Sequence, residues 1–294
     1  TNSAYDVFVR DTMLGVTWRA SMSSFGTQGN SNSGVNGYDL SVSGRYVAFP
    51  STSSNLVPND TNQTDDIFLH DNFTGQTILV SRGLGGVPAN SASYYPCFAR
   101  DGSVVGYIST ASNLVVGDNN GKNDAFVCYV PMGATERASV NTVGVEGNDH
   151  TDKIGMSEDG SSWILISNAR NLVQGDHNGK RDAFVRRNQV TTLISANMSG
   201  DLGNDHTGYW YPTVSFNGRI AAFDSDATNL VPGDTNSRRD TFVRDFDAGP
   251  SLTATGSCPG VITLWISEAV TGATVFFLSG AAGVYSKLTP PCQG

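Results

Sequence analysis

The feature that most constrains the fold is a segment that occurs four times at a constant step. Each copy contains an Asn-Leu-Val triplet, an Asp/Asn-rich turn and a strand-like run; the last copy reads NLVPGDTNSRRDTFVRD over residues 229–245. The triplet begins every 58 residues, at Asn55, Asn113, Asn171 and Asn229. A repeat of this length indicates a supersecondary unit that must stack on its neighbours to bury a core.

Each unit predicts four short strands, which we name A to D. Residues 212–218 exemplify A, 219–225 exemplify B, 240–245 exemplify C and 77–81 exemplify D. A tight turn of the Asn/Asp-Gly type between A and B is a hairpin signal, and its glycine keeps the step of the repeat at Gly44, Gly102, Gly160 and Gly218. Four antiparallel strands per unit predict the blade of a β-propeller.

The units resemble the WD40-like, TolB-type β-propeller repeat, whose A–B hairpin reads roughly S-x-D-G-x-x-V-A-F. The matching stretches are residues 41–49, 98–107, 156–165 and 215–223. The longer form, with S-N-L-V-x-G-D-x-N-G-x-x-D-x-F-V, resembles a version common in exported bacterial proteins. The resemblance implies an all-β propeller but says little about activity, because propellers host many unrelated roles.

The repeat sets the domain boundaries that we predict. A propeller should occupy residues 1–249, with units near 1–38, 39–96, 97–154, 155–211 and 212–249, of which the first and last are partial. The first unit matches only strands C and D, and the last lacks D. The unpaired edges of such partial blades are templates for strand addition, from elsewhere in the chain or from another molecule.

Residues 250–294 break the periodicity and predict a small β-sandwich-like module. So short a segment buries little core unaided, so we predict a disulfide between Cys258 and Cys292. Cys97 and Cys128 are both departures within one repeat, and they leave two alternatives open, a second disulfide or two free thiols.

Composition narrows the classes of partner and compartment. The net charge of −9 argues against nucleic acid, because phosphate binding needs a basic face. No window of the sequence approaches a membrane span. An even cysteine count in an acidic, Lys-poor chain is typical of a secreted or cell-surface protein. The chain begins at Thr1 without a signal peptide, so we expect a processed or excerpted chain.

The B–C loop is the candidate metal site, because its Asp-x-Asn-x-x-x-Asp spacing resembles the middle of calcium loops in EF-hand and integrin-type repeats. Without a first carboxylate or a bidentate Glu, such a loop would bind Ca²⁺ weakly, at ~10⁻⁴–10⁻³ M. The alternative is an Asx-turn scaffold that holds loop N–H groups. The candidate ligands are Asp60, Asn62, Asp66, Asp118, Asn120, Asp124, Asp176, Asn178, Asp182, Asp234, Asn236 and Asp240.

Other patterns point away from catalysis. The sequence contains no H-E-x-x-H and no G-x-S-x-G motif, and we predict no catalytic residue. His150 and His206 follow Gly-Asn-Asp in two linkers and could meet on one rim, although a structural role is favoured. Linker aromatics could stack on sugars or pack in the core, and the core is favoured; they are Tyr94, Tyr95, Tyr209, Trp210 and Tyr211.

The first functional hypothesis is an extracellular structural or assembly component, stabilised by calcium and polymerising into filaments by strand complementation. It would associate with itself or with other surface proteins and glycans. The alternative is a recognition module that binds glycan or protein on the propeller face. A third hypothesis, less favoured, is an enzyme or the propeller domain of one.

Overall fold

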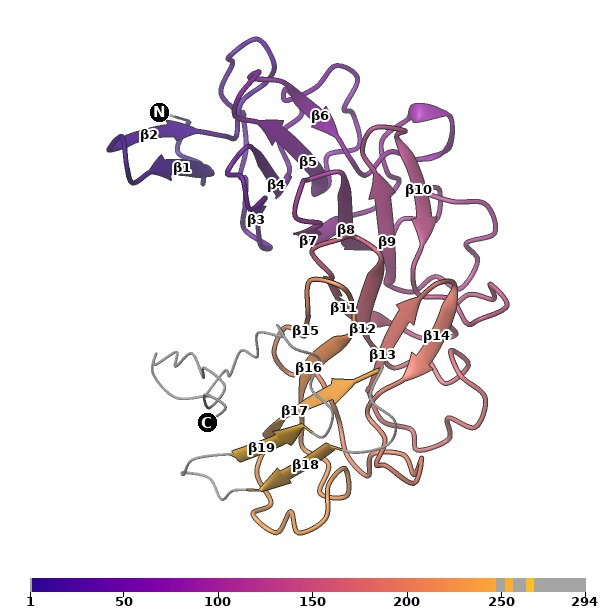
Figure 1. Cartoon of the computed structure of the whole chain (residues 1–294). Coiled ribbons are helices and arrows are strands. Elements are labelled where there is room, and N and C mark those ends of the chain that lie inside the picture. The colour runs from indigo at the N-terminus through magenta and orange to yellow at the C-terminus, as the bar shows by residue number, and fades with distance from the viewer. Residues whose placement is uncertain (1, 247–251, 256–262, 267–294) are drawn as a thin grey trace.

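The computed structural model describes residues 2–246, 252–255 and 263–266 and consists of antiparallel sheets that follow one another along an arc (Figure 1). Three sheets have four strands each, in the order A-B-C-D, which confirms the predicted all-β propeller blades. No helix in the described residues could cross a membrane.

The complete blades contain every strand that the repeat predicts. Their strands are β3 (Asp39–Leu40), β4 (Tyr46–Ser51), β5 (Asp66–Asp71) and β6 (Thr77–Leu79); β7 (Ser93–Phe98), β8 (Val104–Ser109), β9 (Asp124–Tyr129) and β10 (Ala134–Arg137); and β11 (Thr151–Met156), β12 (Ser162–Ser167), β13 (Asp182–Arg187) and β14 (Val190–Leu193). A 3-10 turn, η1 (Leu84–Gly86), lies in the linker between the first two of these blades.

The remaining sheets are incomplete. The N-terminal sheet has only a C strand, β1 (Phe8–Asp11), and a D strand, β2 (Val16–Arg19). The last repeat forms A, B and C as β15 (Thr213–Val214), β16 (Ile220–Ser225) and β17 (Asp240–Asp245). A separate pair, β18 (Leu252–Thr255) and β19 (Thr263–Ile266), follows at that end of the arc (Figure 1).

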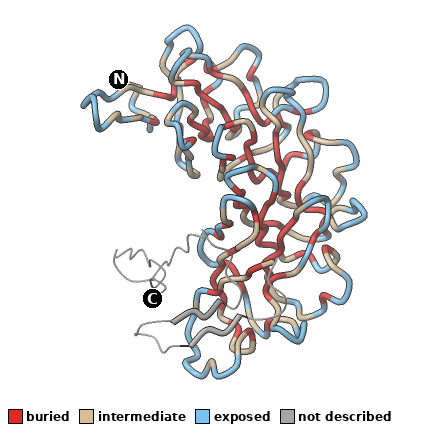
Figure 2. Tube along the Cα trace, viewed as in Figure 1, coloured by how far each residue is buried: buried red, intermediate tan, exposed pale blue. Residues whose placement is uncertain are grey.

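The core lies between neighbouring sheets and within each B–C pair. One cluster joins Ile108 and Val127 of one blade to Ile154 and Leu165 of the next. Figure 2 shows the buried residues running along the middle of the arc, with exposed residues in the loops. The leucines of the repeated triplets are buried and pack in these clusters; they are Leu56, Leu114, Leu172 and Leu230.

The recurrent turn glycine has a packing reason as well as a backbone one. Gly102 has φ of +76°, a left-handed conformation that favours glycine. A Cβ at Gly102 would also lie 2.3 Å from Cδ2 of Tyr46 in the preceding blade. Gly218 is similar, because a Cβ there would lie 2.1 Å from Oγ of Ser162. The A–B turn therefore needs glycine where it touches the blade before it.

An asparagine clasp joins each unit to the next. Asn55 Oδ1 accepts the N–H of Asn30 at 2.9 Å, and Asn55 Nδ2 donates to the carbonyl of Gln28 at 2.8 Å. Equivalent pairs of bonds tie Asn113, Asn171 and Asn229 to the linkers before them. The Asn of the triplet is thus a junction residue.

The cysteine predictions have different outcomes. Cys97 on β7 and Cys128 on β9 are free thiols, and β8 separates their strands, so the structure has the second of the two alternatives. Cys258 and Cys292 lie outside the described residues, as does most of the predicted module over 250–294.

Candidate functional site

The last Asp of each B–C loop joins strand C to the end of strand D. Asp66 is fully buried, and its Oδ1 accepts the hydroxyl of Ser81 at 2.7 Å. Ser81 Oγ in turn accepts the N–H of Ile67 at 3.0 Å. The same arrangement recurs at Asp124 with Ser139 and at Asp182 with Ser195. These carboxylates satisfy internal donors of the blade.

The loop Asn is also committed to the fold. Asn62 Nδ2 donates to Asp66 Oδ2 at 2.6 Å and to the carbonyl of Ala89 at 2.7 Å, while Asn62 Oδ1 accepts the N–H of Thr64. Asn120 and Asn178 repeat all three bonds. Asn236 contacts Asp240 and the N–H of Arg238. This is an Asx-turn arrangement, with both ends of each amide in use.

The first Asp of the loop differs from the last Asp, because some of its carboxylate oxygens have no hydrogen-bond partner. Asp60 and Asp176 are buried, and burial raises the pKa of each carboxyl. Asp176 Oδ1 and both oxygens of Asp234 are buried without a hydrogen-bond partner. Burial, reinforced by the charge of the first Asp, raises the pKa of Asp66 to about 7 and that of Asp182 to about 6. In these two loops the first and last Asp therefore lie near enough to act on each other.

One loop gathers a third carboxylate. Oxygens of Asp118, Asp124 and Glu146 lie within 4.8 Å of one another and could hold a metal ion. Burial raises the pKa of Asp118 to about 6. However, Arg137, whose side chain is only 6 % exposed, pairs with all three carboxylates, at 3.3 Å from Asp118 and 3.9 Å from Asp124. This acidic group thus already contains a cation.

Arg137 and Glu146 were missed by the sequence reasoning, although both depart from the repeat. Arg137 pairs with Phe126 in the register where Leu79 pairs with Phe68 and Leu193 with Phe184. Glu146 bridges to Val140 where the other complete blades have Pro88 and Leu202. A charged pair replacing two apolar positions is a signal that could have found them.

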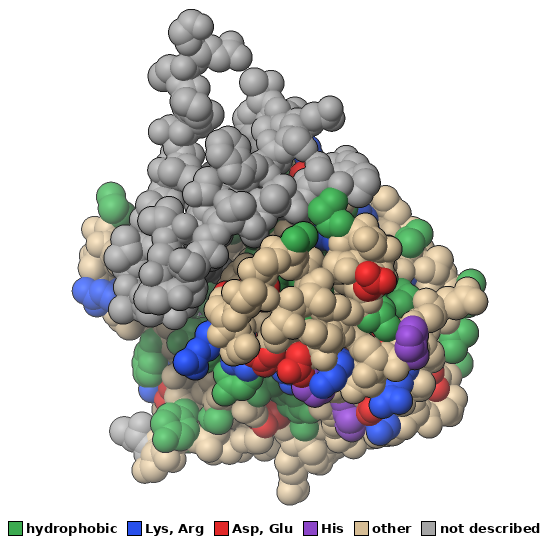
Figure 3. All heavy atoms as spheres, turned by 90° about the horizontal axis from the view of Figure 1, so that it is seen from below, with side chains coloured by type: hydrophobic (Ala, Val, Ile, Leu, Met, Phe, Trp, Pro, Cys, Tyr) green, Lys and Arg blue, Asp and Glu red, His purple; other side chains and the backbone are tan. Residues whose placement is uncertain are grey.

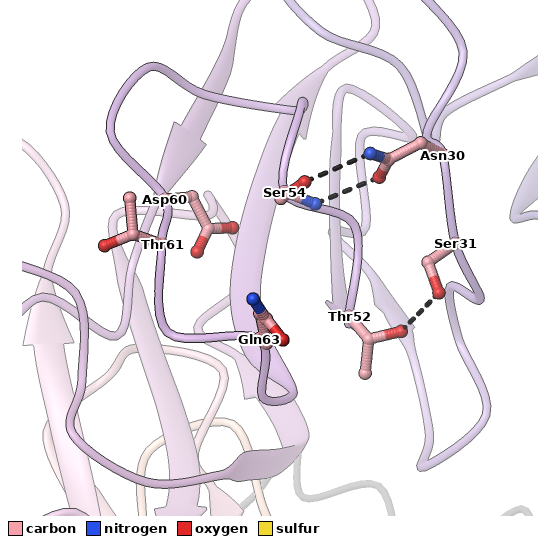
Figure 4. A pocket seen from close by; sticks show the side chains of 7 residues that line it. All are labelled: Asn30, Ser31, Thr52, Ser54, Asp60, Thr61 and Gln63. Carbon is pink, nitrogen blue, oxygen red and sulfur yellow. Dashed lines mark hydrogen bonds between the residues drawn. The ribbon is translucent and has the colours of Figure 1, made fainter.

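Two hollows border these loops. One, of about 390 Å³, lies beside Asp60 and is lined by polar side chains (Figure 4); they are Asn30, Ser31, Thr52, Ser54, Asp60, Thr61 and Gln63. Hydrogen bonds between Asn30 and Ser54 and between Ser31 and Thr52 hold one wall of this hollow. The other, a groove of about 940 Å³, borders Asn178, Leu193 and Leu202.

The linker histidines serve separate blades. His150 Nδ1 accepts the N–H of Asn123 at 3.0 Å, and His206 Nδ1 accepts the N–H of Arg181 at 3.0 Å. Each histidine therefore holds its linker to the B–C loop of its own unit, which is a structural role.

The prediction that the linker aromatics lie in the core is wrong for three of them. Tyr209, Trp210 and Tyr211 are 55 %, 64 % and 60 % exposed, whereas Tyr94 and Tyr95 are partly buried against the core. Tyr95 and Tyr211 meet edge to face at 5.8 Å, so the two linkers form one cluster. In the linker before β15, the backbone N–H groups of Tyr209 and Trp210 donate to Asp224, and the rings of these residues remain more than half exposed.

Comparison with known proteins supports the fold. No protein-family model matches the sequence, and no curated protein matches it. The tricorn protease structure is similar with a TM-score of 0.50 and 11 % identity over 90 % of this chain and 24 % of its own. A putative TolB from Agrobacterium tumefaciens gives 0.46 and 16 %, over 85 % of this chain and 69 % of its own. An oligogalacturonate lyase in complex with manganese gives 0.43 and 13 %, over 82 % and 54 %.

These identities are low, so the similarities concern the fold alone. At that level the predicted β-propeller fold is confirmed. The chain spans about a quarter of the tricorn protease chain.

Proposed function

We propose that this β-propeller is a non-catalytic, extracellular structural or assembly component that adds a strand at the open edge of β1. One observation carries the proposal. In the complete blades the Phe at the centre of strand C is fully buried against strand B, as Phe126 is against Tyr107. Phe8 holds the same register on β1, but it is 57 % exposed because this sheet has no strand B in the described residues.

In the part of the chain that the structure describes, no strand pairs with the open edge of β1, which leaves backbone groups as well as the Phe8 side chain exposed. Val7 accepts the N–H of Ala20, so the alternation of an antiparallel pair directs the N–H groups of Phe8 and Arg10 to the opposite side. An exposed edge of this kind is a template for an added strand. Tyr5, which is 71 % exposed and lies three residues before Phe8, adds a second exposed aromatic side chain near the start of β1.

The surface in Figure 3 has no large patch of one charge that would orient a partner. Acidic and basic side chains are interspersed there among uncharged ones. Strand pairing at β1 is therefore the interaction on which the proposal relies. The extracellular location rests on composition, because the chain is acidic and poor in Lys.

Light scattering of the purified chain over a range of concentrations tests the proposal. We expect the wild-type chain to self-associate and Phe8→Asp to remain monomeric, because a charge at this position opposes burial against strand B. Phe73→Asp is the matched control, since Phe73 is 85 % exposed in a C–D turn. A monomeric wild-type chain, or equal association of both variants, contradicts the proposal.

A second candidate is a glycan-binding recognition module, favoured by the exposed aromatic cluster. Tyr209 and Trp210 meet edge to face at 5.0 Å, and the guanidinium of Arg239 lies 4.1 Å from the centre of the Tyr209 ring. Exposed rings held in place in this way can stack on sugars. A glycan array compares the wild-type chain with Trp210→Ala and with Phe25→Ala, an exposed aromatic outside the cluster. Binding that only Trp210→Ala removes supports this role.

A further inference from the structure

We propose that the B–C loop of the blade β11–β14 binds a divalent cation between Asp176 and Asp182, in the place that the Arg137 guanidinium takes in the preceding blade. The site is distinct from the acidic group of Asp118, Asp124 and Glu146, and it does not depend on the proposed assembly at β1.

The two blades have the same loop but different neighbours. In the blade β7–β10, each of Asp118, Asp124 and Glu146 has an oxygen within 4 Å of the Arg137 guanidinium. Three carboxylates therefore share one permanent cation. The geometry shows that this loop, folded in this way, accepts a positive charge between its two aspartates.

In the blade β11–β14 the residues at both of those positions are apolar. Leu193 pairs with Phe184 as Arg137 pairs with Phe126, and Leu202 bridges to Ala196 in the place of Glu146. These shorter side chains border the groove of about 940 Å³ beside the loop. This blade therefore has no guanidinium at that register, and a solvent-accessible groove lies beside the loop, lined by Gly175 and Asn178.

Asp176 is left with an unsatisfied oxygen. Asp176 is only 8 % exposed, and its Oδ1 is buried without a hydrogen-bond partner. Asp176 lies close enough to Asp182 for its charge to raise the pKa of that carboxyl. A backbone hydrogen bond from Asn178 also acts on this carboxyl group, but it leaves Oδ1 without a partner. A buried carboxylate oxygen without a partner is unfavourable, and a bound cation would remove this cost.

The charged groups around Asp176 do not replace the missing cation. Arg170 and His177 act on Asp176 through their charge, and the Arg170 guanidinium lies near Gly179 of the loop. Arg170 is exposed to solvent, and among the described residues it makes no ion pair with Asp176. His177 Nδ1 is hydrogen-bonded to the carbonyl of Gly175. Lys180 pairs with Asp205 instead.

The donor set indicates the class of ion. Carboxylate oxygens suit hard cations such as Ca²⁺ and Mg²⁺, which accept carbonyl and water oxygens as further ligands. Gly175 and Gly179, both with positive φ, give the loop backbone the sharp turns that such sites use. With two side-chain carboxylates, we expect a dissociation constant of ~10⁻⁴–10⁻³ M for Ca²⁺.

The test follows the backbone amide signals of Gly175 and Gly179 by NMR while CaCl₂ is added, with NaCl of equal ionic strength as the reference. The matched variant is Leu193→Arg with Leu202→Glu, which transfers the charge set of the preceding blade. We expect saturable shifts of both signals in the wild-type chain and none in this double variant. Asp176→Asn should also lose the shifts, and the double variant decides if Asp176→Asn fails to fold.

The reciprocal change strengthens the test. Arg137→Leu with Glu146→Leu removes the internal cation and should give Gly117 and Gly121, in the loop of that blade, saturable calcium-dependent shifts. No shift at Gly175 and Gly179 in the wild-type chain up to about 10 mM CaCl₂, roughly tenfold above the weaker expected constant, overturns the proposal. Equal shifts in the wild-type chain and in Leu193→Arg with Leu202→Glu overturn it as well.

Discussion

The blade β7–β10 and the N-terminal pair β1–β2 contain the same C–D hairpin in two different surroundings. Phe126 pairs with Arg137 in one, and Phe8 pairs with Arg19 in the other. Even so, Phe126 is fully buried and Phe8 is 57 % exposed. The comparison teaches that strands C and D fix their own pairing, whereas their burial depends on an A–B hairpin from elsewhere.

The hydrogen bonds inside the hairpin do not depend on that burial. Ser21 Oγ donates to Asp6 Oδ1 at 2.7 Å and accepts the N–H of Val7, as Ser81 does with Asp66 and Ile67. The local network is therefore a property of the C–D hairpin alone. Packing against strand B adds the burial of the central Phe to this local network.

The largest difference should come from the central Phe. Phe126→Ala leaves a cavity beside Tyr107, and we expect it to lower the free energy of unfolding by about 3–5 kcal/mol. Phe8→Ala should cost less than about 1 kcal/mol, because the ring is more than half exposed in the single chain. Urea denaturation of both variants in dilute solution measures the two costs. Equal costs would mean that Phe8 is covered in solution.

The second largest difference in stability should lie between the two arginines, Arg137 and Arg19. Arg137→Leu leaves three carboxylates without their cation, and we expect a loss of about 3 kcal/mol in stability. Arg19→Leu removes a partly exposed ion pair with Asp6 at 3.3 Å and should cost about 0–1 kcal/mol. Thermal unfolding in EDTA compares them. A cost of Arg137→Leu below that of Arg19→Leu would contradict the buried charge group.

The serines should show no difference. Ser81→Ala and Ser21→Ala each remove the hydroxyl that joins an Asp to a backbone N–H, so each should cost about 1–3 kcal/mol. Denaturation curves of the two variants check this equality. A much smaller cost for Ser21→Ala would show that the network does need a complete blade.

The smallest effect concerns pH in a complete blade. Because the pKa of Asp66 is raised to about 7, the folded chain holds a proton there that the unfolded chain loses above about pH 4. Stability from this group is therefore present below pH 4 and is lost as pH rises to 7. Asp66→Asn should flatten this fall, by on the order of 1–2 kcal/mol, in urea denaturation from pH 4 to 8. An unchanged slope in Asp66→Asn would contradict the raised pKa.

Most of the fold could be predicted because a 58-residue step keeps each strand and turn in register. The positions of the B–C loop residues were equally visible, but their roles were not. Asp66 meets Ser81 from strand D, and Asn62 meets the carbonyl of Ala89 in the next linker, contacts between segments far apart in sequence. Duplication of a unit preserves structural residues and metal ligands equally. The recurrence of these residues therefore could not show which of the two roles they have.

Two features were missed for opposite reasons. Arg137 stands where the complete blades on either side have Leu79 and Leu193, and reasoning from what those units share passes over such a departure. For Trp210 the sequence left two alternatives, stacking on a ligand or packing in the core, and the core was favoured; its linker binds Asp224 through backbone N–H groups and leaves the ring 64 % exposed. Such backbone hydrogen bonds decide which side of a linker faces the blade. They cannot be predicted from the order of apolar and polar residues in the sequence.

The asparagine clasp has a consequence for how such a chain can change in length. The same hydrogen bonds join the triplet Asn to the preceding linker in every unit, at Asn55, Asn113, Asn171 and Asn229. The junction between any two units is therefore equivalent. Removing or duplicating one whole unit would rejoin matching halves of a clasp, whereas a cut within a unit would leave an amide without its partner. The chain could therefore gain or lose whole units while every clasp keeps its hydrogen bonds, so the arc could change in length in steps of one unit.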